Sequence, residues 1–141
     1  MEPLPLSSPK QLLLWLFRAR RRIRVTGFSM YPTLKNNDLI LVNPHAYKTK
    51  SPQINDIVLA QDPRPHRHQA LIIKRITAII DDRYHLRGDT PDPTASTDSR
   101  HYGPIPRNLI LGQAICRLPR WPTRLNRKLI YRFLVWKNKP E

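Results

Sequence analysis

The sequence predicts a mainly β domain with a short basic helical segment at each end. Three observations support this prediction. Short runs rich in Ile, Leu and Val recur through the middle of the chain, and clusters of Pro, Asn, Asp and Ser separate them. The 141 residues include 15 prolines but only four glycines, which argues against a helical bundle and against a glycine-linked repeat array. The two ends combine basic residues with apolar residues at roughly helical spacing.

Length and composition fit one folded domain with its own core. Hydrophobic residues make up 40% of the chain, which is too apolar for a disordered polycation. The formal net charge is +15, of which residues 1–24 carry +5 and residues 117–141 carry +7. A nucleic acid or an anionic membrane, if one is bound, should therefore contact the ends. We divide the chain into a basic amphipathic N-terminal segment (1–21), a β-domain (22–118) and a basic amphipathic C-terminal segment (119–141).

The N-terminal segment contains an unbroken apolar run, Leu12 to Phe17, followed by five arginines between positions 18 and 24. Six residues are too few to cross a bilayer, which needs about 20. A secretory signal would place its charges before the apolar run, so we expect no membrane-spanning segment here. Two interpretations remain: a helix docked on its own domain, or an interfacial helix whose arginines meet anionic lipid head groups. Residues 121–137 pose the same choice.

Five β-strands are expected between the ends, at residues 39–42, 56–60, 70–80, 84–87 and 109–118. Each is a short run of mostly Ile, Leu and Val bounded by turn-forming residues. The connections 43–52 and 62–69 carry prolines and charges, so we expect surface loops there.

Ser29 lies between a strand-like stretch and a proline-containing turn. Gly27 frees the backbone just before it, and Pro32 stiffens the chain just after it. Such a turn can hold a hydroxyl and its own N–H toward a cleft, where the N–H would serve as an oxyanion donor. Serines in turns are common, so a purely structural role also fits this segment.

Lys74 is embedded in an apolar strand. Alternation places Lys74 on the same face as Ile72 and Ile76. Burial lowers a lysine pKa and would leave a neutral amine able to take a proton from a serine. Ser/Lys pairs are an alternative to the Ser/His/Asp arrangement. The competing interpretation is an edge-strand lysine with its ammonium in water.

Five boxes in order carry a resemblance to a known family. They are S-M-x-P-T-L at Ser29–Leu34, N-D-L-I-L-V at Asn37–Val42, the pair Lys74-Arg75, Gly88-Asp89, and S-x-D-S-R-x-x-G at Ser96–Gly103. Together they resemble signal peptidase I and its relatives, serine proteases with a Ser/Lys dyad whose compact β-domain is shared with the LexA-type self-cleaving repressors. The resemblance covers roughly residues 22 to 116.

The resemblance implies a role for each matching residue. Ser29 would be the nucleophile and Lys74 the general base, and Ser96 would hydrogen-bond the Lys74 amine. Two ion pairs, Asp98 with Arg100 and Arg75 with Asp89, would hold the catalytic strands in register. In some members a serine two positions before the nucleophile supplies a second oxyanion donor, but Gly27 stands there in this chain.

The layout of this sequence suggests a particular relative. Only 28 residues precede Ser29 and only 21 lie between Lys74 and Ser96, so we expect neither the preceding transmembrane helices nor the inserted β-domain that membrane-bound members usually have. This is similar to the nickel-type superoxide dismutase maturation protease. The resemblance implies cytoplasmic removal of an N-terminal extension from the dismutase precursor, bound as an extended peptide. The alternatives are a minimal signal peptidase held on the inner membrane by its basic ends, a LexA-like self-cleaving regulator, and a non-enzymatic basic module that binds nucleic acid or membrane. We rank nucleic-acid binding lowest, because charge alone would not require an embedded lysine.

No cofactor or metal is expected. The histidines are His45, His66, His68, His85 and His101, and no carboxylate cluster accompanies them. His101 follows the S-x-D-S-R box, but in the family that position is not catalytic. Cys116 is expected to be a buried core residue.

Overall fold

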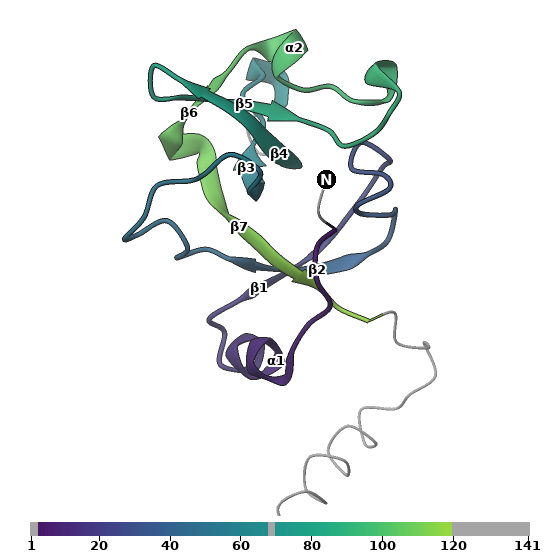
Figure 1. The fold of residues 1–141 in the computed structure, drawn as a ribbon, viewed down its shortest axis with the longest axis vertical. Helices are drawn as coiled ribbons and strands as arrows, with labels where there is room; N and C mark the ends of the chain where they lie inside the picture. Colours follow the sequence, from purple (N-terminus) through teal and green to yellow (C-terminus); the bar gives the residue numbers. More distant parts are fainter. Residues whose placement is uncertain (1–2, 68–69, 120–141) are drawn as a thin grey trace, which may run out of the picture.

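The computed structural model describes residues 3–67 and 70–119, in which seven β-strands form one antiparallel sheet in the order β1-β2-β7-β3-β4-β5-β6. The strands are β1 (Arg21–Arg24), β2 (Leu39–Asn43), β3 (Ile57–Gln61), β4 (Leu71–Ile80), β5 (Arg83–Arg87), β6 (Ile105–Pro106) and β7 (Ile110–Arg117). The helices are α1 (Pro9–Leu16) and α2 (Ser99–Tyr102), and single 3-10 turns cover Pro65–Arg67, Pro93–Ala95 and Arg107–Leu109. The sheet curls, with β1 and β2 in the lower part of the view and β4 and β5 in the upper part (Figure 1). The predicted mainly β class is therefore confirmed.

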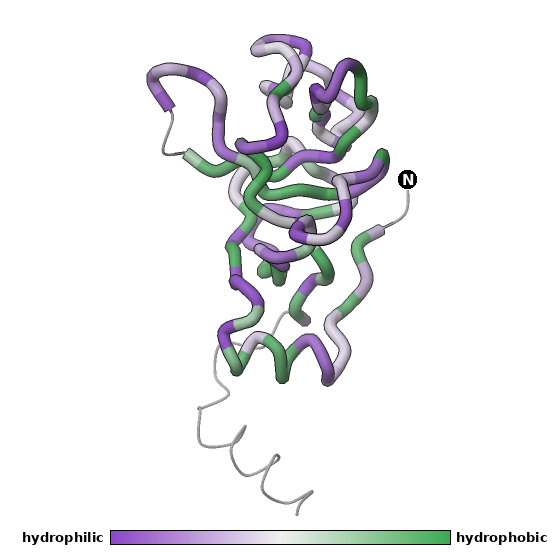
Figure 2. Tube along the Cα trace, turned by 90° about the vertical axis from the view of Figure 1, so that its left-hand side faces the viewer, coloured by the Kyte–Doolittle hydropathy of each residue, from purple (hydrophilic) through white to green (hydrophobic). Residues whose placement is uncertain are grey.

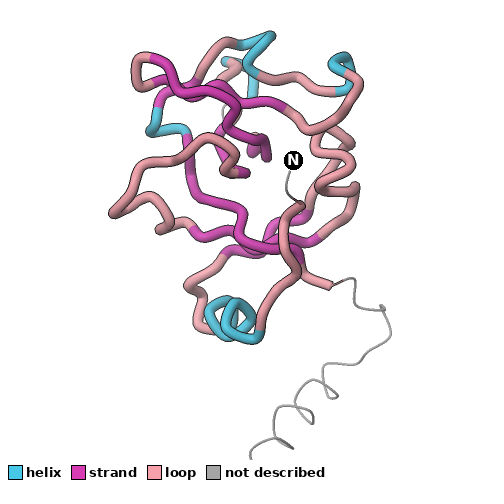
Figure 3. Tube along the Cα trace, in the orientation of Figure 1, coloured by secondary structure: helices cyan, strands magenta, loops and turns pink. Residues whose placement is uncertain are grey.

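All five expected strands are present, with ends that differ by at most one residue. Strands β1 and β6 were not predicted. Strand β1 reads Arg-Arg-Ile-Arg and forms the sheet's outer edge, where only one side chain in four is partly buried, so its apolar pattern is nearly absent. Strand β6 has two residues and includes a proline. The strands form the middle of the molecule, long loops connect them, and the helices are short (Figure 3).

The curled sheet encloses two groups of buried apolar side chains. One packs the N-terminal residues and the Ser29 turn against β2 and β3, and it contains Leu4, Val25, Met30, Leu34, Ile40, Val42, Ile57, Leu59 and Ala114. The other lies beneath β5 and β6, and it contains Ala46, Tyr47, Val58, Ala60, Ile76, Tyr84, Leu86, Ile105 and Ile110. Burial of this apolar area drives folding, and it fixes the positions of the loops that carry polar residues.

Helix α1 is held beside the sheet but buries none of its residues. The chain before it pairs with the end of β7, where Leu6 bridges Arg117 and the Ser7 N–H donates to the Arg117 carbonyl at 2.8 Å. The chain after it enters β1. Helix α1 therefore lies on the outside of its own domain, where Arg20 Nε donates to Gln11 Oε1 at 3.2 Å, and both interpretations of the apolar run stay predictions. The C-terminal helical segment predicted for residues 121–137 lies outside the described residues.

None of the helices in the described ranges is both long and apolar enough to span a bilayer.

Candidate active site

Ser29 lies on the turn between β1 and β2, and the core anchors the residues beside it. Met30 and Leu34 are buried, and the Leu34 N–H donates to the Met30 carbonyl at 2.8 Å. Ser29 itself is half-buried, and its carbonyl accepts the Thr90 N–H at 3.2 Å. Its own N–H donates to none of the described residues. The turn therefore presents a hydroxyl next to an uncommitted amide donor.

Lys74 is buried in β4, with only 3% of its surface exposed. Ile76, on the same face, is fully buried, as the alternation predicted. The alternative of an edge-strand lysine with its ammonium in water is therefore wrong. Burial lowers the pKa of Lys74 to about 8, because removal from water penalises the charged amine. The nearby Asp98 carboxylate raises this pKa, and the guanidinium of Arg100 lowers it.

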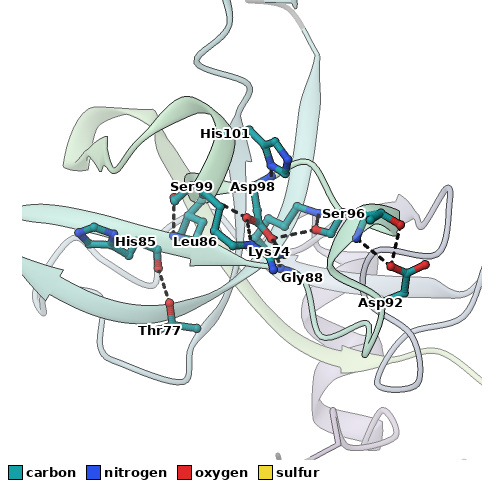
Figure 4. Close-up of polar contacts among 12 residues, drawn as sticks. Lys74, Thr77, His85, Leu86, Gly88, Asp92, Ser96, Asp98, Ser99 and His101 are labelled. Atoms are coloured by element: carbon teal, nitrogen blue, oxygen red, sulfur yellow. Dashed lines mark hydrogen bonds and ion pairs between the residues drawn. The ribbon is translucent and has the colours of Figure 1, made fainter.

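A chain of hydrogen bonds fixes the Lys74 amine (Figure 4). Nζ donates to Ser96 Oγ at 3.1 Å, and that hydroxyl donates to Asp98 Oδ2 at 3.0 Å. Arg100 binds the same carboxylate through two nitrogens, at 2.9 Å and 2.7 Å. Because Ser96 gives its proton to Asp98, it can only accept from Lys74. A neutral amine held in this way keeps its lone pair free for another proton.

Asp98 links this network to the backbone. Its side chain caps the N-terminus of α2 and accepts the Gly88 N–H at 3.3 Å. Burial opposes ionisation of Asp98, but hydrogen bonds from Arg100, Gly88 and Ser96 outweigh it and hold the pKa of the carboxyl well below its usual range. Asp98 therefore stays charged at neutral pH.

The second predicted ion pair is also present. Arg75 donates to both carboxylate oxygens of Asp89, at 2.9 Å and 2.7 Å, and both side chains are buried. Arg75 also donates to the Asn55 carbonyl at 2.9 Å. The pair ties β4 to the segment that follows β5. Lys74 directly precedes Arg75, and Gly88 directly precedes Asp89. The two parallel hydrogen bonds of the pair therefore fix the position of Lys74 relative to Gly88.

Ser29 and Lys74 line one cavity of about 360 Å³. Residues 23–26 and residues 71–74 both line it, so the curl of the sheet brings two segments that are distant in sequence to one cavity. Within the described residues no hydrogen bond joins the Ser29 and Lys74 side chains. The cavity therefore holds a hydroxyl and a buried amine on its wall, with open space beside them.

Two strand edges border this cavity without a partner among the described residues. Strand β3 pairs with β4 from Leu71 onward, but β5 pairs with β4 only from Arg75. One edge of residues 71–74 is consequently open. Strand β1 pairs with β2 alone, so its outer edge is open as well. Open edges of this kind accept an added strand.

Gly88 holds the two halves of the site together by having no side chain. A Cβ at this position would overlap the Ser29 carbonyl oxygen and Ser96 Oγ. We expect Gly88→Ala to lower the free energy of unfolding by about 1–3 kcal/mol. Any peptidase activity at this site should fall about 100-fold, because the two serines must move apart.

Gly103→Ala is the matched control for the Gly88 substitution. A Cβ at Gly103 meets open space, and the only cost is a φ of +79°. With a ψ of 177°, this is backbone that almost only glycine adopts, so the control should lose about 1–3 kcal/mol of stability and far less activity than Gly88→Ala. Peptidase activity is measured for both alanine variants, and urea unfolding gives their stability. Equal losses of activity would show that steric overlap at position 88 does not affect the site.

The sequence analysis missed Arg64 as a cavity residue. Arg64 lines the cavity, and its Nε donates to Asp62 at 2.9 Å and 3.2 Å. Hydrogen bonds from Arg64 hold the pKa of the buried Asp62 carboxyl below its usual range. The guanidinium also helps to lower the Lys74 pKa. The Asp-Pro-Arg spacing was a usable signal for the pair, but nothing in it showed which way the loop turns.

The remaining polar candidates have structural positions. His101 belongs to the capping box of α2, where its side chain accepts the Asp98 N–H. Cys116 is buried, as predicted. In the ranges that the structure describes, no three His, Cys, Asp or Glu side chains gather closely enough to hold a metal ion.

Comparison with known proteins agrees with this geometry. Residues 11–91 match the family described as signal peptidase, peptidase S26. The chain is 32% identical over 119 residues to the mitochondrial ATP-independent inner membrane protease subunit 1a of Arabidopsis thaliana, covering 70% of this chain and 68% of that protein. It is 28% identical over 118 residues to the mitochondrial inner membrane protease subunit 1 of Mus musculus, with 71% and 69% covered. A similar subunit of Xenopus tropicalis is 31% identical over 115 residues, with 69% and 66% covered. The matched family segment contains Ser29, Lys74 and Asp89, and on this basis the chain belongs to the signal peptidase S26 family of peptidases.

Proposed function

We propose that this protein is a serine endopeptidase that removes an N-terminal segment from precursor proteins, with Ser29 as nucleophile and Lys74 as general base. One observation carries the proposal: a buried lysine with a pKa of about 8 lines the same cavity as Ser29. A lysine in water, with a pKa of 10.5, would be almost fully protonated at neutral pH. About a tenth of the Lys74 amines are neutral at pH 7, which is enough for a working base.

The proposed reaction has two halves. The Ser29 hydroxyl gives its proton to the Lys74 amine while its oxygen bonds to the scissile carbonyl carbon, and the Ser29 N–H donates to the oxyanion. The C–N bond then breaks, and the Lys74 ammonium returns the proton to the leaving amine. Water attacks the acyl-enzyme and gives a proton to Lys74, and the ester bond to Ser29 then breaks as Lys74 returns that proton to Ser29 Oγ, which releases the acid and restores the free enzyme.

Ser96, Asp98 and Arg100 act as positioning residues in this proposal. Ser96 fixes the direction of one Lys74 N–H, and the Asp98 carboxylate fixes the direction of the Ser96 proton. Arg100 offsets the charge of Asp98, which would otherwise raise the Lys74 pKa further. Arg75 and Asp89 keep the strands that carry these groups in register.

The substrate is proposed to bind as an extended peptide. The open edges of β1 and of the first half of β4 lie on the cavity, and they offer main-chain hydrogen bonds to a strand passing Ser29. Only a segment without secondary structure of its own can enter such a gap. Unfolded N-terminal extensions of precursors meet this requirement.

Processing at a membrane surface is favoured over maturation of nickel-type superoxide dismutase. The names of the similar proteins from Arabidopsis thaliana and Mus musculus place those proteases at an inner membrane. Nothing in the similarities supports the dismutase precursor or a cytoplasmic location, both of which were expected from the compact layout. A minimal signal peptidase acting at the membrane surface therefore becomes the main interpretation of this chain's role.

Cleavage of defined substrates tests the proposal. The full-length protein is incubated with a proteome-derived peptide library, and the new N-termini are identified by mass spectrometry. The Ser29→Ala protein, treated in the same way, is the blank. We expect new termini only with the unaltered protein. Membrane-anchored precursors in vesicles and a nickel-type dismutase precursor are then compared, and preferential cleavage of the first is expected. Identical product lists from the protein and the blank would overturn the peptidase proposal.

The pH dependence of cleavage follows from the Lys74 pKa. Only the neutral amine accepts the Ser29 proton, so kcat/KM should rise about tenfold per pH unit below pH 8 and level off above it. The measurement uses a peptide without titratable side chains. A midpoint near 10.5, the value for a lysine in water, or a flat profile would exclude Lys74 as the base.

A further inference from the structure

Arg64 brings a positive charge to the cavity wall, and the proposed mechanism gives it no role. We propose that Arg64 selects substrates that carry an acidic side chain about two to four residues before the scissile bond. The proposal deepens the proposed function and rests on it, since it names a class of N-terminal extension that the peptidase would prefer. Binding of a peptide can be measured without cleavage, so the two proposals can fail separately.

Asp62 holds the Arg64 guanidinium in a fixed direction. Arg64 Nε donates to the two carboxylate oxygens of Asp62 at 2.9 Å and 3.2 Å, and Nη2 donates to the same carboxylate. The Arg64 backbone N–H also donates to Asp62 Oδ1 at 3.1 Å. The Asp62 side chain is 1% exposed, whereas that of Arg64 is 33% exposed. The carboxylate therefore lies beneath the guanidinium and leaves its outer side accessible from the cavity.

The guanidinium keeps one terminal nitrogen for a ligand. Among the described residues, Arg64 Nη1 has no hydrogen-bond partner. Because Asp62 already fixes the plane of the guanidinium, a carboxylate that binds Nη1 does not have to order the arginine side chain. Arg24 also lines the cavity, but it is exposed, and none of the described residues holds its side chain by a hydrogen bond. Arg64 is therefore the arginine that is prepared to bind.

The charge of the cavity favours an anionic side chain. The described residues that line the cavity include Arg24, Arg64 and Lys74 but no Asp or Glu. Asp62 and Asp98 are both buried, and each is already paired with an arginine. The potential in the cavity is therefore positive, and it favours an acidic substrate side chain over a neutral or basic one.

The surroundings of Arg64 indicate which substrate side chains it meets. Its charge acts on Lys74 and on Tyr102, and Tyr102 packs with Ile72 against the buried apolar side chains beneath β5 and β6. Arg64 therefore lies toward the face of β4 that carries Ile72 and Lys74. The side chains of a bound strand alternate between faces, so every second one points to this face. Those between point to the apolar side around Ile73.

The loop after β3 places Arg64 beside the start of β4. The Asp62 N–H donates to the Ala70 carbonyl at 2.9 Å. On the two sides of residues 68–69 in Figure 2, the loop is mainly hydrophilic and the start of β4 is hydrophobic. From Lys74 back to Leu71 the open edge spans about 10 Å, at about 3.3 Å per residue. A strand on this edge thus brings a residue about two to four positions from the scissile bond to Arg64.

The acidic side chain is expected in the extension that is removed. The gap takes several consecutive residues in an extended conformation, and the proposed precursor offers these before the scissile bond, since the part after the bond is the folded mature protein. The part before the bond also stays on the enzyme as the acyl group, whereas the other product leaves after the first half of the reaction. The open edge beside Arg64 therefore holds the extension.

Matched peptides that carry Glu or Gln test the proposal by two measurements. Binding of short fluorescent peptides to the full-length Ser29→Ala protein is measured by anisotropy. Cleavage by the unaltered protein is measured on a peptide from the library described above, with Glu or Gln moved along the positions before the scissile bond. We expect about tenfold tighter binding of the Glu peptides. We expect a similar gain in kcat/KM, carried by KM, at one position and not at its two neighbours.

Arg64→Gln should remove the preference and bring the ratio between Glu and Gln peptides close to one. This variant leaves the buried Asp62 carboxylate without its ion pair, so a second variant, Asp62→Asn with Arg64→Gln, replaces both partners by neutral amides. Urea unfolding checks the fold of both. Arg83→Gln is the matched control, because Arg83 is exposed at the start of β5 and lies outside the cavity. The control should keep the full preference.

Equal affinities for Glu and Gln peptides, or failure of both to bind, would overturn the proposal. So would a preference that survives in both Arg64 variants, or one that is lost on Arg24→Gln and kept on Arg64→Gln. Preferential binding of Glu peptides that depends on Arg64, without cleavage of any peptide by the unaltered protein, would support this selectivity and contradict the proposed peptidase.

Discussion

Replacing Ser29 by alanine is expected to reduce kcat for peptide cleavage by about 10⁴-fold or more, while the fold persists. In the proposed mechanism the Ser29 hydroxyl forms the acyl bond, and removing a nucleophile removes nearly all of the covalent pathway. The substitution removes one oxygen from a half-buried side chain, and the Ser29 backbone contact with Thr90 stays. The rate of cleavage is measured by mass spectrometry, and the free energy of unfolding by urea titration.

Ser51→Ala controls for the loss of a serine hydroxyl as such, because Ser51 is exposed and lies outside the cavity. This variant should cleave at the full rate. Cleavage by Ser29→Ala within a factor of about ten of the unaltered protein would place the nucleophile elsewhere, whatever the stability data show.

Replacing Lys74 by methionine should have the second-largest effect on cleavage, a loss of about 10³-fold or more. Methionine keeps most of the volume of the side chain but has no atom that can accept the Ser29 proton. Lys74→Arg should be equally inactive, since a guanidinium stays protonated at any working pH. The pair of variants separates the need for a base from the need for a positive charge.

The methionine variant should also change stability, in the direction opposite to activity. The pKa of Lys74 in the folded protein lies below that of the unfolded chain. Between about pH 8 and 10.5 the unfolded chain therefore holds a proton that the folded protein lacks, and stability rises with pH across that window. Below the window both states hold the proton, and the folded state carries a cost on the order of 3 kcal/mol for the buried ammonium.

Lys74→Met removes that cost, so at pH 7 it should be about 1–2 kcal/mol more stable than the unaltered protein, after the lost hydrogen bond to Ser96 is subtracted. The rise in stability above pH 8 should shrink in the variant by the contribution of this one group. Urea titrations at pH 7 and pH 10 measure both. A variant that is less stable at pH 7 would show that Lys74 serves the fold, and the pattern expected of an active-site residue would be absent.

The central strands were predictable because their signal is local. Apolar runs bounded by turn residues mark β2, β3, β4, β5 and β7 within one residue of their ends. Strand β1 escaped because its stability comes from pairing with β2, while its own side chains are mostly exposed arginines. The exposure of α1 could not be predicted either. An apolar stripe shows that a helix has an apolar face, but the sequence does not show which surface packs against that face.

Part of the candidate site was also readable from local patterns. Period-two alternation put Lys74 beside Ile76, and burial on that face follows directly. The hydrogen bond to Ser96 and the pairing of Asp98 with Arg100 came from the family resemblance, and the structure contains both. Arg64 was not predictable, since its place on the cavity wall depends on how the loop after β3 folds back. The catalytic roles of Ser29 and Lys74 remain predictions that the variants above will decide.

The edge of residues 71–74 that has no partner among the described residues has a consequence for the selectivity of the proposed peptidase. Main-chain pairing reads the shape of a polypeptide and is nearly blind to its side chains, so a gap of this kind admits any chain that can be drawn out straight. In a folded mature protein the backbone N–H and C=O groups are already hydrogen-bonded within its own strands and helices, so they are not free to pair with this edge. The proposed peptidase would thus select polypeptides by their folding state before it selects them by sequence, and we expect newly made or still-unfolded termini to be its substrates.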